Sequence, residues 1–256
     1  MDNFLFKSDL RTVIAEYREK CSEIGFLDLN LSIDLDDAYS VMLSAIQNSN
    51  QAVGAWKLGG TNQKTQNTFK VSEPYFGALF CDEVVFITEN KGSIPLLPSL
   101  KGEAEIALRI SEFGAKKRNS GSEDASLIFD AWSVAIEFPY SVFSDIPDSG
   151  IEALVSDRCA AGALVLGPVN VGLPPEEFSI SIEIVGAAKS CGNQEDLLMS
   201  PVDAALDFRK RAFCGEFGLD AGQWVSTGGI TDCLLLNKYD TVKLEFCGET
   251  VYTLEI

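Results

Sequence analysis

From residue 51 to the end of the chain, apolar and β-branched residues come in short runs that Gly, Pro and Asn interrupt. Runs of this length are typical of short strands in a sheet. So many short strands with so few helices favour a closed or sandwich-like β core over a doubly wound parallel sheet. The strands predicted in this way are 51–59, 83–88, 103–110, 132–138, 162–166, 179–186, 224–227, 241–247 and 250–255.

The first part of the chain has a different pattern, which predicts an N-terminal helical segment over 1–50 ahead of a β-rich domain over 51–256. Apolar residues at helical spacing follow Ser8, a candidate N-cap. The same spacing recurs over 35–46, after acidic residues that suit a helix N-terminus. One later helix is predicted from Pro201, because proline fits the first helical position. The expected fold class is therefore α+β.

Two glutamates one residue apart are the first indication of a site. In the predicted strand 103–110, alternation places Glu103, Glu105 and Arg109 on one face and apolar residues only on the other. Carboxylates at i and i+2 lie roughly 6.5–7 Å apart at their Cα atoms, close enough for both to bind one hard cation. The pattern is half of an oxygen-ligand metal site, although the polar face of an amphipathic strand is more often simply solvated.

A second strand strengthens the metal interpretation. Glu137 is the only charged residue within 132–138, and its companions on the same face are the small residues Ser133 and Ala135. A lone carboxylate among small residues indicates a lined cavity rather than open solvent, because burial of the charge requires a partner. Three carboxylates from two strands would form a facial set for Mg²⁺ or Mn²⁺, which prefer oxygen ligands.

Lys57 is the fourth candidate residue. Trp56 and Leu58 occupy one face of the predicted strand 51–59, and Lys57 lies with Val53 and Ala55 on the other. A lysine in such a strand can be a surface residue whose stem lies along apolar neighbours. If it faces the carboxylates instead, it is a candidate proton carrier or substrate anchor, because the pKa of lysine responds readily to burial.

The composition excludes several classes of function. The chain contains no histidine, which removes Ser-His-Asp and Cys-His catalysis and HExxH zinc sites. Acid–base chemistry must come from Glu, Asp, Lys, Tyr, Cys or metal-bound water. Twenty basic and 38 acidic residues give a net charge of −18, which argues against nucleic acid and anionic membranes as partners.

The seven cysteines are scattered and form no CxxC motif, so neither a zinc ribbon nor a thioredoxin-type site is indicated. The first residues show no basic region followed by an apolar run, and no stretch approaches a membrane-spanning length. We therefore expect a reduced, cytoplasmic protein. The expected partners are a small-molecule substrate and further copies of the chain in a homo-oligomer, with no nucleic acid and no membrane.

Six segments resemble a known family in order and spacing. They match the 2-keto-4-pentenoate hydratase / 2-oxohex-3-enedioate decarboxylase family of the fumarylacetoacetate hydrolase superfamily, from Val53 to the C-terminus. The resemblance implies a mixed β-roll or barrel core of the fumarylacetoacetase C-terminal-domain type. The segments are VGAWKLGGTNQKTQ, VSEPYFGALF, GEAEIALRI, AIEFPYSVF, DRCAAGALVLG and TGGITDCLLLNKYDTVKLEF.

The same resemblance implies a site. Glu103, Glu105 and Glu137 match the family's ligands for Mg²⁺ or Mn²⁺, and Lys57 matches its active-site lysine. In such enzymes the metal holds the 2-oxo or enol oxygen and the C1 carboxylate of the substrate, as Lewis acid and template. The TGG segment, with Thr227 and Gly228, matches a part of the family that borders the substrate pocket.

Three positions depart from the family. Tyr75 stands where the family motif PDFG has an acidic residue, and Arg158 and Ala160 stand where DNAS has an asparagine and a serine. These positions belong to the expected substrate-binding site, so two polar groups that position water or substrate in the family are missing. This puts the usual hydration in doubt and leaves metal-assisted enolate chemistry open. Hydrolysis of a C–C bond by a Glu–His pair is disfavoured because the chain has no histidine.

Three functions remain open. The favoured one is a divalent-metal-dependent lyase of the hydratase/decarboxylase type, acting on a 2-oxo or 2-hydroxydienoic acid through an enolate, with Lys57 moving a proton. The second is another 2-oxo acid decarboxylase or tautomerase, in which Arg158 or Arg109 binds a distal carboxylate. The third is a non-catalytic ligand-binding or assembly protein that keeps the fold.

Overall fold

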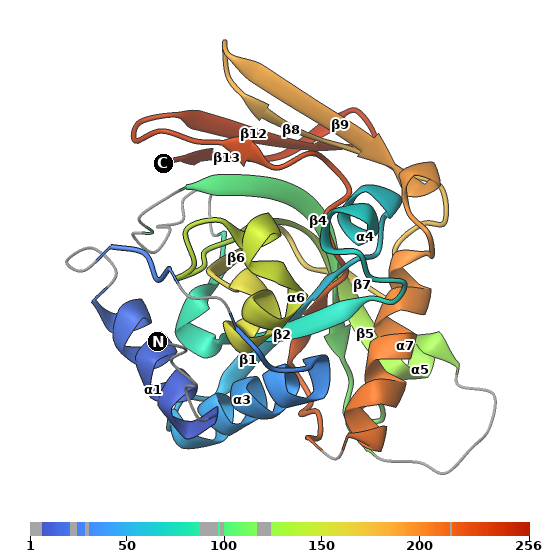
Figure 1. Ribbon diagram of the computed structural model, residues 1–256. Helices are drawn as coiled ribbons and strands as arrows, with labels where there is room; N and C mark the ends of the chain where they lie inside the picture. Colours follow the sequence, from blue (N-terminus) through green and yellow to red (C-terminus); the bar gives the residue numbers. More distant parts are fainter. Residues whose placement is uncertain are drawn as a thin grey trace.

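A computed structural model describes residues 7–20, 25–28, 31–87, 97, 100–116, 124–215 and 217–256. Two packed β-sheets and the helices around them form the α+β fold that the sequence predicts (Figure 1). Each predicted strand is present with ends shifted by a few residues, except that residue 88 lies outside the described part of the chain. None of the helices in that part is long and apolar enough to cross a membrane.

The larger sheet is mixed and curled. Its strand order is β2-β1-β10-β4-β5-β6-β3, with β11 added to β4 and β7 added to β5. Its strands are β1 (Val53–Gly59), β2 (Tyr75–Phe80), β3 (Val84–Phe86), β4 (Lys101–Ile110), β5 (Phe129–Phe138), β6 (Ala163–Leu166), β7 (Asn170–Val171), β10 (Trp224–Ser226) and β11 (Leu234–Leu235).

The smaller sheet is antiparallel and stacks on β4 at the top of Figure 1. Its order is β13-β12-β8-β9, formed by β8 (Ser179–Ile184), β9 (Ala188–Asn193), β12 (Thr241–Phe246) and β13 (Glu249–Glu255). The core between the sheets contains Ile106 of β4, Ile136 of β5 and apolar side chains of β8 and β12. The apolar faces that alternation predicts for 103–110 and 132–138 are buried in this core. The glutamates of β4 and β5 therefore lie on the opposite face of the larger sheet.

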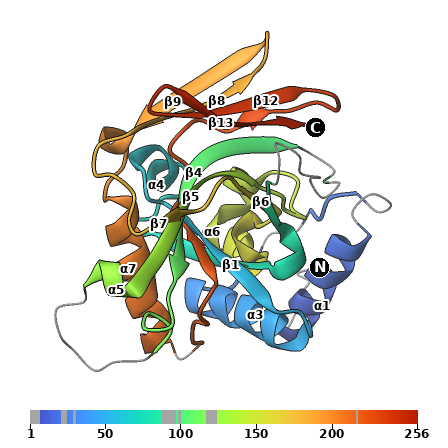
Figure 2. The same ribbon diagram turned by 180° about the vertical axis from the view of Figure 1, so that it is seen from behind.

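The helices cover the rest of the larger sheet, as the view from behind also shows (Figure 2). Leu10 and Ile14 of the first helix and Val41 of the second share a core with Phe143 and Ala153. The helices are α1 (Lys7–Glu19), α3 (Leu35–Asn48), α4 (Gln63–Phe69), α5 (Ala125–Ile128), α6 (Ile146–Ser156) and α7 (Pro201–Cys214).

The predicted helices over 35–46 and from Pro201 are present as α3 and α7, and Pro201 lies in the first turn as expected. Asp34 is the N-cap of α3, since its side chain accepts a hydrogen bond from the backbone N–H of Asp37. The pattern analysis did not predict β2, β9, α4 or α6, and α4 and α6 both contribute to the site described below.

Candidate active site

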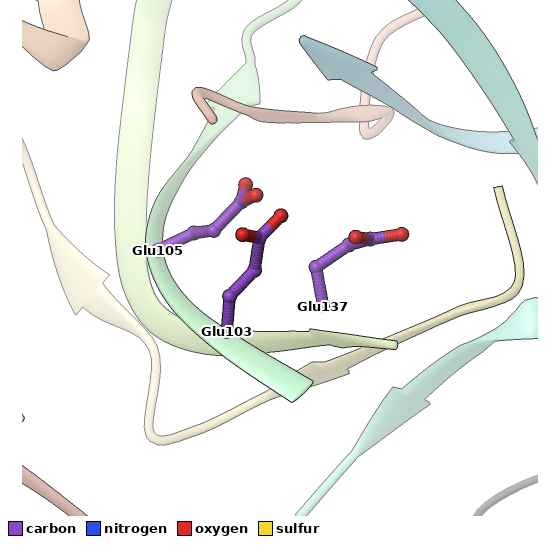
Figure 3. Close-up of side chains that lie close together, drawn as sticks. All are labelled: Glu103, Glu105 and Glu137. Atoms are coloured by element: carbon purple, nitrogen blue, oxygen red, sulfur yellow. The ribbon is translucent and has the colours of Figure 1, made fainter. Parts of the chain in front are cut away.

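Three glutamate side chains converge on the concave side of the larger sheet. β4 and β5 pair antiparallel with Glu103 opposite Glu137, and Glu105 follows two residues along β4. One carboxylate oxygen from each side chain lies within 4.8 Å of the other two. Figure 3 shows the three side chains next to one another, on the same side of the two strands.

Small side chains leave room for this convergence. Ala107 of β4 and Ser133 and Ala135 of β5 lie on the same face as the glutamates, and all three are fully buried. Glu105 and Glu137 are themselves 0% exposed, whereas Glu103 is partly exposed. The face predicted to carry a lined cavity is therefore enclosed by protein, with Glu103 nearest to the solvent.

Glu105 is held from β10. The hydroxyl of Ser226 and the backbone N–H of Gly228 both donate to Glu105 Oε2, the latter at 3.1 Å. Thr227 ties the same segment to β4, because its hydroxyl donates to the Ile106 carbonyl at 2.8 Å. Gly228 thus orients a carboxylate and Thr227 fixes the segment, but neither lines the cavity, whereas the next residues along the chain do.

Lys57 faces the carboxylates. Its Nζ lies 2.9 Å from Glu137 Oε2, and its side chain is 7% exposed. Its neighbours Trp56 and Leu58 point to the opposite face of β1 and pack in the core there. Of the two interpretations of this lysine, the structure favours the one in which it belongs to the site.

The charges of this group are unbalanced, because one lysine stands beside three carboxylates. Burial raises the pKa of Glu105 well above its ordinary value, and the charges of Glu103 and Glu137 add to the rise. Burial also raises the pKa of Glu137 to about 7, which the nearby Lys57 only partly offsets. Burial alone would lower the pKa of Lys57, but the three carboxylates outweigh it and the pKa is raised.

Two oxygens of the group have no hydrogen-bond partner among the described residues. They are Glu105 Oε1 and Glu137 Oε1, and both are shielded from solvent. A buried carboxylate oxygen without a donor is costly, and each such atom calls for an explanation. Convergent carboxylates, unpartnered oxygens and an excess of negative charge form a set that could hold a hard divalent cation.

A cavity of about 810 Å³ opens above the group, with Lys57 and Glu103 in its lining. Tyr75 and Ala160, predicted as substrate-binding residues, line the same cavity. The structure thus brings four of the predicted residues together around one space, over the buried Glu105 and Glu137. The other walls come from α4, the start of α6 and the segments 139–147 and 229–233.

Tyr75 lies across Gly59. The two residues are partners in the pairing of β1 and β2, and a Cβ atom on Gly59 would lie 2.3 Å from the tyrosine ring. Only glycine leaves space for the ring on this face, which is the face of Lys57. Tyr75 is 6% exposed, and burial raises the pKa of its hydroxyl well above the ordinary value. The hydroxyl is therefore a neutral hydrogen-bond donor at the cavity wall.

Ala160 belongs to a left-handed turn. Arg158, Cys159 and Ala160 all have φ between 53° and 55°, a conformation that costs roughly 1–2 kcal/mol for each L-residue. The turn fits because the Arg158 carbonyl packs against Gly77, where a Cβ atom would lie 2.0 Å away. It turns Cys159 and Ala160 toward the cavity, and the Cys159 thiol donates to the Phe76 carbonyl at 2.8 Å.

The two arginines considered as anchors for a distal carboxylate lie elsewhere. Both terminal nitrogens of Arg158 contact Glu83, at 2.6 and 2.7 Å, and its guanidinium stacks on Phe80. Arg109 donates to Asp130 at 2.7 Å. Neither lines the cavity. We correct the expectation for both, because a guanidinium already paired with a carboxylate has little charge left for a substrate.

Several residues at the site were not predicted. One is Ser226, whose hydroxyl donates to the Glu105 carboxylate. Another is Thr61, which lines the cavity and has a buried hydroxyl with no partner among the described residues. Phe26, at the cavity mouth, is 48% exposed. No spacing rule identifies these residues, because the fold brings them together from parts of the chain that are far apart in sequence. Proximity to the TGG and LGGT segments was the only available signal for Ser226 and Thr61.

Several solved structures have a similar fold. No model of a known protein family matches the sequence. Two structures of 4-oxalocrotonate decarboxylase from Pseudomonas putida G7 share 17% identity with the chain over 99% of both chains. One, with calcium and acetate, has a TM-score of 0.80, and the other, with magnesium and adipate, has 0.79.

A fumarylpyruvate hydrolase from Pseudomonas aeruginosa, in complex with Mn²⁺ and pyruvate, has a TM-score of 0.59 and 13% identity, and the match covers 81% of this chain and 92% of that one. Identities this low show the fold alone. They confirm the fold that the resemblance implies, because the chain folds like these solved proteins over most of its length.

Proposed function

We propose that the protein is a divalent-metal-dependent enzyme that acts on 2-oxo acids through an enolate, of the hydratase/decarboxylase type. One observation carries the proposal. Three carboxylates and one lysine converge beside a cavity, with two carboxylate oxygens that no hydrogen bond from the described residues satisfies. Groups with perturbed pKa values in a cavity are typical of catalytic sites.

The residues present fit Mg²⁺ or Mn²⁺. Glu103, Glu105 and Glu137 would hold the ion, and its charge would offset the excess of carboxylates. When bound, such a cation stabilises the negative charge that develops on a 2-oxo oxygen. The structures that share the fold support this choice, since one contains magnesium and another Mn²⁺ with pyruvate, a 2-oxo acid.

The chain's own groups account for the rest of the chemistry. Lys57 lines the cavity beside Glu137, and in this proposal it moves a proton to or from the carbon next to the 2-oxo group. Tyr75 presents a neutral hydroxyl that can donate a hydrogen bond to a substrate oxygen. Ser226 and Gly228 fix the carboxylate of Glu105 in place before any ligand arrives.

A second candidate is favoured by the cavity wall. Tyr75 and Ala160 line the cavity at the two positions where the resembling family has an acidic residue and a hydroxyl. Hydration needs a positioned water. Decarboxylation of a 2-oxo acid that carries a second, conjugated carboxylate releases that group as CO₂ and leaves the enolate, which a proton then quenches, and tautomerisation only moves a proton through the enolate. We therefore rank decarboxylation or tautomerisation next to the hydratase reaction. The full-length likeness to 4-oxalocrotonate decarboxylases supports the same ranking.

Deuterium exchange tests the shared step of all these reactions. A base removes a C3 proton from the 2-oxo acid, the electron pair moves onto the 2-oxo oxygen, and a deuteron returns from solvent. We expect Mg²⁺- or Mn²⁺-dependent exchange at C3 of pyruvate and longer 2-oxo acids, followed by NMR in D₂O. A protein that binds these acids but exchanges none of them would be a binding protein without this chemistry, and the proposal would fail.

A further inference from the structure

Arg18, near the end of α1, contacts the left-handed turn formed by residues 158–160. Its guanidinium donates to the backbone carbonyl of Asp157, just before the turn, and to that of Ala161, just after it, both at 2.9 Å. It also donates to the carboxylate of Asp157 at 2.5 Å, across 139 residues of sequence. One side chain thus holds both ends of a turn whose three residues have positive φ.

The same guanidinium is bonded to the neighbouring part of the cavity wall. It donates to the Tyr140 carbonyl at 3.2 Å, and the Tyr140 N–H donates to the Ala160 carbonyl at 2.8 Å. The second carboxylate oxygen of Asp157 accepts from the Ser141 hydroxyl at 2.7 Å and from the Val142 N–H at 2.8 Å. Tyr140, Ser141 and Ala160 all line the cavity. The pair of Arg18 and Asp157 therefore joins two segments of the wall.

Attachment of α1 to the fold does not account for this buried ion pair. Leu10 and Ile14 already pack α1 against Phe143, whereas burial of two charges costs free energy unless their geometry is favourable. Asp157 is 0% exposed and the Arg18 side chain 15%. The turn does need such a partner, because residues in sparsely populated conformations persist only where their surroundings hold them, most often at functional sites.

We propose that Arg18 is a positioning residue of the active site. It lies outside the lining of the cavity and acts through the turn, which carries Cys159 and Ala160 into the cavity wall. In this proposal α1 is part of the catalytic unit, although it begins far from the glutamates in sequence. The effect on catalysis rests on the proposed function, whereas the hold of Arg18 on the turn does not.

Arg18→Lys tests the proposal, with Arg209→Lys as its matched control. An apolar residue at position 18 would leave Asp157 as an unpaired buried charge and destabilise the whole fold. Lysine keeps the charge but lacks the planar fork that reaches several acceptors at once. Arg209, on α7, is also buried and donates to the carbonyls of Gly114 and Lys116 at 2.7 and 3.0 Å. None of these three residues lines the cavity.

The thiol of Cys159 reports directly on the turn, because it is 1% exposed whereas the other described cysteines are exposed. N-ethylmaleimide is applied well below the melting temperature, and mass spectrometry follows the peptide that contains Cys159. We expect Arg18→Lys to be labelled there at least about tenfold faster than wild type, since loss of a hydrogen bond from a charged donor favours local opening by about that factor. Arg209→Lys should be labelled at the wild-type rate. Unchanged labelling in Arg18→Lys, or an equal increase in both variants, would overturn the proposal.

C3 exchange of pyruvate shows whether the turn matters for catalysis. It should fall by about tenfold or more in Arg18→Lys and stay unchanged in Arg209→Lys, because displacement of a wall remote from the chemistry lowers the rate. Mg²⁺ should still raise the melting temperature of both variants, since the glutamates lie on β4 and β5. Faster labelling of Cys159 with full exchange would overturn the positioning role. A wild-type protein that exchanges nothing would instead overturn the proposed function, and the labelling would still decide whether Arg18 holds the turn.

Discussion

Glutamates and lysines gather in two regions of this molecule, with opposite consequences. On the smaller sheet, Lys243 contacts Glu183 and Glu245 at 2.8 and 3.0 Å, and Lys189 contacts Glu245 at 2.5 Å. On the larger sheet, Lys57 contacts Glu137 at 2.9 Å beside the buried Glu105 and the partly buried Glu103. We call these the surface cluster and the buried cluster.

The surface cluster is partly solvated and balanced. Hydrogen bonds from Lys189, Lys243 and Ser181 lower the pKa of Glu245 to about 2. In the buried cluster, burial raises the pKa of the carboxylates. The same residue types therefore stabilise the fold in one region and oppose it in the other. An excess of buried carboxylates over cations therefore marks the ligand site, whereas equal numbers at a solvated surface mark structural ion pairs.

The largest expected effect concerns metal and Glu105. Mg²⁺ should raise the melting temperature and EDTA should lower it, because binding to the native state at about 100 times Kd adds about 2.7 kcal/mol to the free energy of unfolding. Glu105→Gln should abolish this difference. It should not lower the melting temperature of the metal-free protein, since it removes a repelling charge. Differential scanning fluorimetry measures both.

Glu245→Gln serves as the control for Glu105→Gln, because it changes the same residue type in the surface cluster. It should leave the response to Mg²⁺ and EDTA intact. A wild-type melting curve that is indifferent to metal and chelator would remove the basis for separating the two clusters.

Lys57→Met comes next. If Lys57 moves a proton, the variant should lose C3 exchange or turnover by at least about a hundredfold, the usual scale for general acid–base catalysis. Metal binding should persist, because lysine is not a ligand. The stabilisation by Mg²⁺ should increase, since Glu137 loses its only nearby cation among the described residues.

Lys243→Met, in the surface cluster, is the matched control and should leave the rate unchanged. Full activity in Lys57→Met, or loss of its metal response, would make Lys57 a structural residue like the lysines of the surface cluster.

A smaller effect is expected from the cavity wall beside the buried cluster. The double variant Tyr75→Asp, Ala160→Ser restores the two polar groups of the resembling family. We expect it to gain some hydration of a 2-hydroxydienoate, measured by the loss of the dienoate's ultraviolet absorbance. A wild-type protein that already hydrates such a substrate at about 1–10³ s⁻¹ would show that these two positions do not decide the reaction.

The smallest effect is the pH dependence of Glu245→Gln. The pKa of Glu245 is lowered from 4.5 to about 2 in the folded protein, so its ion pairs stabilise the fold above pH 4.5 and lose their effect as the pH falls toward 2. The variant should melt slightly lower than wild type at pH 7, because exposed ion pairs contribute little. Melting curves from pH 7 to pH 2 should converge, and a difference that widens at low pH would contradict the assignment.

Alternation was enough to predict the three glutamates of the buried cluster. In the segments 103–110 and 132–138 one face is uniformly apolar, so the placement of Glu103, Glu105 and Glu137 follows from the period of a strand. The same rule placed Lys57 on one face of β1. It could not say whether that face met solvent or the glutamates, because strand order is a long-range property. In the structure, β10 pairs with both β1 and β4, and this strand order brings the Lys57 face of β1 to the same side of the sheet as the glutamates.

Elements without alternation were missed for physical reasons. β2 is buried at every position, so its residues show no polar face. α4 has no fully buried residue and hence no apolar stripe, and α6 is interrupted at Gly150, where φ is 87°. The direction of Arg158 depends on a left-handed turn that no residue type in it favours. Much of the cavity wall comes from α4 and α6, so the shape of the cavity could not be derived from the sequence, although the small residues beside Glu137 indicated that a cavity was present.

The contact between Tyr75 and Gly59 also bears on how such a sequence can arise. The tyrosine ring can lie against position 59 only if that position already has no side chain, since even a methyl group there would overlap the ring. Once the tyrosine is in place, mutation of Gly59 is closed off. The two substitutions therefore have an order, with glycine first and tyrosine second. Among descendants of a common ancestor, we expect some sequences that have glycine at position 59 without tyrosine at position 75. We expect none that combine tyrosine at position 75 with a larger residue at position 59.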